Sequence, residues 1–166
     1  MTFAATSVSL RPASYDSPEA SLLIAAVQDE YLTRYGGHDE TPVDPLEFAP
    51  PRGRFVIARV HDTPVGCGGW RDHAPPGDGS RTAEIRTAEI KRMFVSAEAR
   101  RRGIARMILA DLERTAAEAG YERVILETGD QQPESVALYR AAGYAATAPF
   151  GHYAADAGSM YFAKML

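Results

Sequence analysis

Val95-Ser96-Ala97-Glu98-Ala99-Arg100-Arg101-Arg102-Gly103-Ile104-Ala105 places three adjacent arginines and a glycine between two apolar segments. Residues 89–95 before it read as a buried strand, and the apolar periodicity of residues 103–119 predicts a helix that ends at Gly120. A helix start exposes unpaired N–H groups and a partial positive charge, which suits a phosphate group. A solvated basic helix start fits the same residues, so the spacing alone leaves both interpretations open.

The N-terminal half predicts a strand, a helix and a hairpin in that order. Val8 and Leu10 alternate with polar neighbours, and Ser17 followed by Pro18 is typical of a helix start. That helix is expected to run to the glycine pair at 36–37. Residues 38–53 hold four prolines and predict a loop. The pattern then favours strands at 54–61 and 65–71 around a turn at 62–64, followed by a loop at 72–80.

The C-terminal half predicts a strand at 123–128, a helix at 134–142, and two closing strands at 144–147 and 159–166. Residues 82–86 and 87–91 are near-duplicates, which leaves the start of the 89–95 strand uncertain. Strands and helices mix without a regular βαβ repeat. The expected fold is therefore a single α/β domain over residues 1–166, with a mixed sheet and helices on both faces.

The composition of the chain argues against several classes of protein. The chain has 166 residues and a net charge of −4, which argues against a general nucleic-acid binder. One cysteine excludes an intrachain disulfide and favours a reducing compartment. Because no apolar run approaches the ~20 residues of a membrane helix, we expect a cytoplasmic protein without a membrane partner. The four histidines lack metal-ligand spacing, so no metal is expected.

A glycine-rich segment at 66–69 offers a rival motif. A dinucleotide fingerprint needs a strand, a turn and then a helix. Here Trp70 and Arg71 continue the strand pattern instead. A bulged strand is the favoured interpretation.

The motif Arg100-x-x-Gly103-x-Ala105 resembles the phosphate-binding signature of the GNAT acetyltransferase superfamily. Residues 89–95, 126–128, 138–144 and 159–166 resemble further family segments, in the right order over 54–166. This resemblance implies a mostly antiparallel sheet and an acetyl-CoA-dependent N-acetyltransferase. The residues it assigns to acetyl-CoA are Met93, Phe94 and Val95 through their backbone, with Arg100, Arg101, Arg102, Gly103, Ile104, Ala105, Gln132 and Tyr139.

The same resemblance suggests catalytic residues. Glu89 matches a family glutamate on the central strand and is expected to be the base, with burial raising its pKa. Glu84, its counterpart in the near-duplicate, and a water chain are the alternatives. Tyr139 matches the family tyrosine that faces the CoA sulfur and is expected to be the acid.

The acceptor is the least determined part of the prediction. The resemblance places it among Tyr31, Tyr35, Trp70, Arg71 and Tyr153. A primary amine of a small molecule is the leading acceptor. A protein lysine or N-terminus is the second hypothesis, and a non-catalytic acetyl-CoA-binding regulatory module is the third. Whether the chain forms a homodimer is left open.

Overall fold

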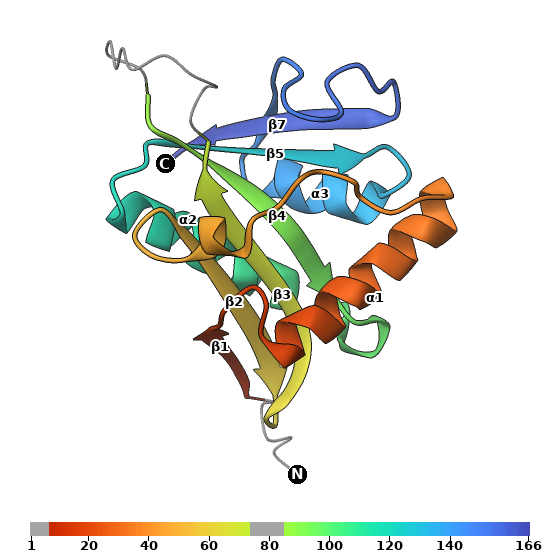
Figure 1. Ribbon diagram of the computed structural model, residues 1–166, viewed down its shortest axis with the longest axis vertical. Helices are drawn as coiled ribbons and strands as arrows, with labels where there is room; N and C mark the ends of the chain where they lie inside the picture. Colours follow the sequence, from red (N-terminus) through yellow and green to blue (C-terminus); the bar gives the residue numbers. More distant parts are fainter. Residues whose placement is uncertain (1–6, 74–84) are drawn as a thin grey trace.

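The described residues, 7–73 and 85–166 of the computed structural model, form a seven-stranded sheet in the order β1-β2-β3-β4-β5-β7-β6 (Figure 1). β4 and β5 pair in parallel, and the other neighbours pair antiparallel. The predicted α/β fold with a mostly antiparallel sheet is confirmed. The predicted loop at 72–80 falls mostly outside the described residues.

The first half of the chain contains β1 (Val8–Pro12), α1 (Pro18–Tyr35) and the short 3-10 helix η1 (Pro45–Phe48). The hairpin strands β2 (Gly53–Val60) and β3 (Thr63–Asp72) follow. Ser17 caps α1 by accepting a hydrogen bond from the Ala20 N–H at 3.3 Å, as the sequence predicts. The hairpin turn is tighter than predicted, because His61 and Asp62 both adopt positive φ and leave Thr63 in the strand.

The second half contains β4 (Thr87–Val95), the 3-10 helix η2 (Ala97–Ala99), α2 (Ile104–Glu118) and β5 (Arg123–Gly129). It ends with α3 (Pro133–Ala141), the two-residue β6 (Ala145–Ala146) and β7 (Ser159–Met165). β4 begins two residues before the predicted strand, since Thr87 and Ala88 already pair with β5.

Each face of the sheet is covered by helices, as expected, with α1 on one side and α2 and α3 on the other (Figure 1). On the α1 face, Leu23 and Val27 pack with η1 and with the inward side chains of β2. On the opposite face, Ile108 and Leu112 of α2 form the centre of the larger core. Burial of these apolar side chains is the main favourable contribution to folding.

β4 bends away from β5 partway along its length. The parallel pairing covers only Thr87 to Glu89 on β4. Beyond it, Arg92 and Met93 lie opposite the single residue Gly68 of β3, and Arg92 has a φ of 60°. This is a β-bulge, which kinks a strand and increases its twist. The bulge therefore opens the sheet between β4 and β5. The sequence favoured a bulge at residues 66–69 of β3, but in the ladder between β3 and β4 the extra residue lies on β4, opposite Gly68.

Candidate active site

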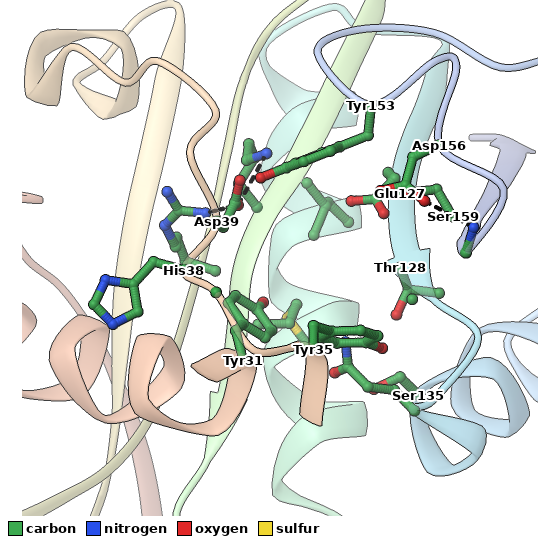
Figure 2. A pocket seen from close by; sticks show the side chains of 18 of the residues that line it. Tyr31, Tyr35, His38, Asp39, Glu127, Thr128, Ser135, Tyr153, Asp156 and Ser159 are labelled. Atoms are coloured by element: carbon green, nitrogen blue, oxygen red, sulfur yellow. Dashed lines mark hydrogen bonds and ion pairs between the residues drawn. The ribbon is translucent and has the colours of Figure 1, made fainter. Parts of the chain in front are cut away.

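A pocket of about 260 Å³ fills the opening between β4 and β5. Its walls come from four parts of the chain: the C-terminal half of α1 with the loop after it, the bulged part of β4, the end of β5 with the start of α3, and the segment before β7 (Figure 2). Because β4 has lost its β5 partner here, backbone polar groups along its open edge are available to a ligand.

The pocket is bridged by Tyr153. Its side chain extends from the segment before β7 across to the loop that follows α1, beside Asp39 (Figure 2). The Tyr153 hydroxyl accepts a hydrogen bond from the Glu40 N–H at 2.7 Å, and the Tyr161 hydroxyl donates to the Tyr153 carbonyl. Gln28 holds the same loop, accepting from the Asp39 N–H at 2.8 Å. Two segments far apart in the sequence thus join over the pocket.

The end of α1 is fastened to the start of α3. Arg34 donates to the Gln131 carbonyl at 2.8 Å and pairs with Glu134 at 2.6 Å. The Tyr35 hydroxyl accepts from Gln132 at 3.2 Å and lies over Gly129, where a Cβ atom would come within 1.9 Å of it. A side chain at position 129 would therefore displace the Tyr35 ring. Tyr35 and Gln132 both line the pocket, although a contact between Gln132 and acetyl-CoA stays a prediction.

Tyr139 lines the pocket from α3 and is 5% exposed. Its ring packs edge-on to Tyr144, with the ring centroids 5.7 Å apart. Burial, and to a lesser degree the charge of Glu127, raises the pKa of the Tyr139 phenol above its ordinary value. The hydroxyl therefore stays protonated at neutral pH, as an acid must.

Glu89, the residue expected to be the base, is surrounded by basic side chains. Its carboxylate lies 3.2 Å from Arg71, 3.8 Å from His73 and 3.9 Å from Lys91, and it is absent from the pocket wall. Burial acts to raise the pKa of Glu89, but these three neighbours together hold the pKa below its ordinary value. The expected rise in the Glu89 pKa is wrong, because the buried carboxylate lies among Arg71, His73 and Lys91. Glu84, the alternative, lies outside the described residues.

Glu127 is the carboxylate that the sequence reasoning missed. It projects into the pocket from β5, near Asp156 and Ser159 (Figure 2). Burial, with some contribution from Asp39 and Asp156, raises the pKa of Glu127, while Ser159 and Lys91 oppose the rise. The signal was available in the strand alternation, since Leu126 faces the α2 core and its neighbour must face the other way.

Lys91 and Arg92 place two cations at the base of the pocket, 8% and 5% exposed. Asp39 is the shared partner of both: it pairs with Arg92 and lies 3.5 Å from the Lys91 ammonium. Burial acts to raise the pKa of Asp39, but the two cations and hydrogen bonds from Thr41 lower it well below the usual range. Buried ions of this kind need such partners, because an unpaired buried charge costs several kcal/mol.

The basic turn has the geometry expected of a phosphate site. Gly103 precedes α2 with a φ of 75°, no side chain caps the helix, and a Cβ at Gly103 would meet nothing within 4 Å. Arg101 and Arg102 are exposed, whereas Arg100 pairs with Glu30 of α1 and donates to the Val95 carbonyl at 2.9 Å. Thus Arg100 braces the turn against α1 in this structure.

The other residues that were predicted to contact acetyl-CoA or the acceptor lie either in the pocket wall or in the hydrophobic cores. Tyr31 lines the pocket beside Tyr35, and Met93 lines it from β4. The side chains of Phe94, Val95 and Ile104 are buried in the two cores, so any contact from them is through the backbone. Ala105 follows Ile104 in the first turn of α2.

Trp70 and Arg71 do not form part of the pocket. Trp70 is 2% exposed, packs against Tyr121 with ring centroids 5.0 Å apart, and donates to Thr115 at 3.0 Å. Arg71 is held by Glu89 and by Glu47 at 2.7 Å. This pocket does not support the predicted acceptor contacts, because β3 turns Trp70 to the α2 face and Arg71 ties the proline-rich loop to the sheet.

In the described part of the chain, no group of three or more His, Cys, Asp and Glu side chains is placed to hold a metal ion. Nor does any helix of residues 7–73 and 85–166 have the length and apolarity to cross a membrane.

Comparison with known proteins identifies the relatives of this fold. The pattern of the acetyltransferase (GNAT) family matches residues 24–144. An IAA acetyltransferase from Azospirillum brasilense is 35% identical over 154 residues, covering 91% of this chain and 95% of that protein. A solved acyl-CoA N-acyltransferase from Klebsiella pneumoniae, described as putative, superposes with a TM-score of 0.75 at 24% identity, covering 97% of this chain and 99% of that one. A GNAT family acetyltransferase from Elizabethkingia anophelis, solved with acetyl-CoA bound, gives 0.63 at 16% identity, with 96% and 98% covered.

Proposed function

Because the chain belongs to the GNAT acetyltransferase family and is an acetyl-CoA-dependent N-acetyltransferase, we propose that it transfers the acetyl group directly to a primary amine of a small molecule. The transfer takes place in the pocket between β4 and β5. With its buried Cys67 thiol kept reduced, the protein works in the cytoplasm.

The uncapped start of α2 and the open edge of β4 fit acetyl-CoA. N–H groups of the turn from Arg100 to Ala105 hold the pyrophosphate, with Arg101 and Arg102 adding positive potential. Backbone N–H groups near the bulge at Met93 orient the acetyl carbonyl oxygen and stabilise the charge that it gains. Tyr139 donates a proton to the departing sulfur.

The observation that carries the small-molecule assignment is the hydrogen bond between Tyr153 and the Glu40 N–H. It joins two sides of the pocket, whose volume is about 260 Å³. A protein lysine needs an open groove for its flanking residues. A pocket that is bridged in this way favours a small amine over a peptide.

The test is an acetylation assay with acetyl-CoA and two panels, one of small primary amines and one of lysine-containing and N-terminal peptides. CoA release and the mass of each product are measured. We expect acetylated small amines, and a kcat/KM at least about tenfold higher than for any peptide, which corresponds to ~1.4 kcal/mol. A preference for peptides, or binding of acetyl-CoA without transfer to any amine, contradicts the proposal.

A further inference from the structure

Glu127 differs from Asp39 and Glu89 in forming no ion pair in the described residues, although Lys91 lies near enough to lower its pKa. Asp39 is paired with Lys91 and Arg92, and Glu89 is paired with Arg71. In the described residues Glu127 forms no ion pair, although it is partly buried and lines the pocket. A partly buried carboxylate without an ion pair favours a cation from outside the protein.

The lysine and arginine of the pocket, by contrast, already have carboxylate partners. Lys91 lies 3.5 Å from Asp39 and 3.9 Å from Glu89. Arg92 pairs with Asp39 and also donates to the Tyr15 hydroxyl at 3.1 Å. Within the part of the chain that the structure describes, every pocket-lining Lys and Arg side chain is therefore already paired with a carboxylate of the protein. Asp156, on the same wall as Glu127, adds further negative charge (Figure 2).

Aromatic side chains surround Glu127. Burial is the main reason that the pKa values of Tyr31, Tyr139 and Tyr153 are raised, and the charge of Glu127 raises each of them further. All three residues line the same pocket as Glu127. Aromatic rings in a pocket wall can attract an ammonium group and provide apolar surface for its carbon substituent.

We propose that Glu127 binds the ammonium group of the acceptor and then deprotonates it, and that the acceptor is an amine without a carboxylate beside the amino group. This inference rests on the acetyl transfer proposed above. At pH 7 an ordinary alkylammonium is neutral only at a cost of about 4–5 kcal/mol, because its pKa is about 10.4. A carboxylate that also holds the ammonium lowers that cost where the amine has to react.

Glu127 takes one proton from the ammonium, and the nitrogen lone pair forms the C–N bond to the acetyl carbonyl carbon. The C–S bond breaks and its electron pair goes to sulfur, which takes up a proton through Tyr139. The nitrogen loses its second proton, so each turnover releases one proton to water, by way of Glu127.

The acceptor class is tested on the unaltered protein with two matched pairs that differ only by a carboxylate: phenylethylamine against phenylalanine, and putrescine against ornithine. Calorimetry first establishes that acetyl-CoA binds; failure at this step counts against the proposed function. We then expect kcat/KM to favour the carboxylate-free member of at least one pair by about tenfold or more. Equal or better use of the amino acids, or no transfer to either amine, overturns the inference.

The role of Glu127 is tested with Glu127→Gln across pH 7 to 9, on the best amine of that panel. The unaltered protein should give a nearly flat kcat/KM, since it binds the ammonium form. The variant should lose about 100-fold at pH 7 and then gain about tenfold per pH unit, as neutral amine accumulates below its pKa of about 10. Its acetyl-CoA affinity should not change.

Glu113→Gln is the matched control. Glu113 is a partly buried glutamate on α2 that pairs with Lys164 at 2.9 Å and does not line the pocket. This variant should keep the flat pH profile. A Glu127→Gln variant that matches the unaltered protein, or that loses activity evenly at every pH, shows that Glu127 is not the base. If Glu127→Gln does not fold, the comparison of matched pairs still decides the inference.

Discussion

At the residue scale, two glutamates on neighbouring strands, one beside the pocket and one in its wall, have opposite surroundings. Glu89 lies among Arg71, His73 and Lys91, whereas Glu127 faces the pocket without an ion pair in the described residues. Similar burial therefore gives opposite pKa shifts, because the partners decide the sign. Sequence alone identified the strand positions but not which cations would surround each carboxylate.

Glu89 should contribute to stability rather than to proton transfer. Because its folded pKa is below its unfolded value of about 4.3, its contribution is complete above that pH and is lost as the pH falls through the folded pKa. Glu89→Gln should lower the free energy of unfolding at pH 7 by about 1–3 kcal/mol. The loss should shrink below pH 4, as measured by urea unfolding at each pH. An activity loss that higher pH restores, with stability unchanged, would reinstate Glu89 as the base.

Tyr139→Phe should keep the fold and the acetyl-CoA affinity but lower turnover, by about 10- to 100-fold, because only the hydroxyl in the pocket is lost. The matched control is Tyr144→Phe. Tyr144 packs against Tyr139, and its buried hydroxyl has no hydrogen-bond partner in the described residues. This control should retain turnover. Equal turnover in both variants makes Tyr139 a packing residue.

At the scale of elements, the periodic segments were predicted well, and the helix ends fell within a residue or two. Capping explains this accuracy, because Ser17 and Gly36 mark the ends of α1 by local chemistry. The loop after α1 was not predictable in the same way. Its path depends on Gln28, Tyr153 and the β4 cations, which contact Asp39 or Glu40 from distant parts of the chain.

The turn before α2 gives a prediction about acetyl-CoA. Gly103→Glu introduces a negative charge where the helix start should hold the pyrophosphate, so affinity should fall at least tenfold by calorimetry, about 1.4 kcal/mol. Gly151→Glu is the control: its φ of 71° is close to the 75° of Gly103, and its surroundings are equally open. Both variants carry the same backbone strain. Equal affinities for the two contradict a phosphate site at this turn.

At the scale of the whole molecule, the bulge in β4 and the short pairing with β5 produce the pocket. The residue pattern predicted the strands, and the family resemblance assigned the backbone of residues 93–95 to acetyl-CoA. Neither placed Trp70 correctly, because the face of β3 on which it lies depends on the register of that strand with its neighbours. Local sequence patterns were thus enough to predict the helices and strands. The composition of the site could not be predicted in this way, because it depends on how distant segments of the chain meet.

The central claim is that the acetyl group reaches the pocket between β4 and β5 with Glu127 and Tyr139 on its walls. A crystal structure of the protein with bound acetyl-CoA tests it most directly. We predict the pyrophosphate on the turn from Arg100 to Ala105, the sulfur within hydrogen-bond distance of the Tyr139 hydroxyl, and the acetyl carbon facing Glu127. A cofactor that leaves this pocket empty, or a sulfur remote from Tyr139, would contradict the account.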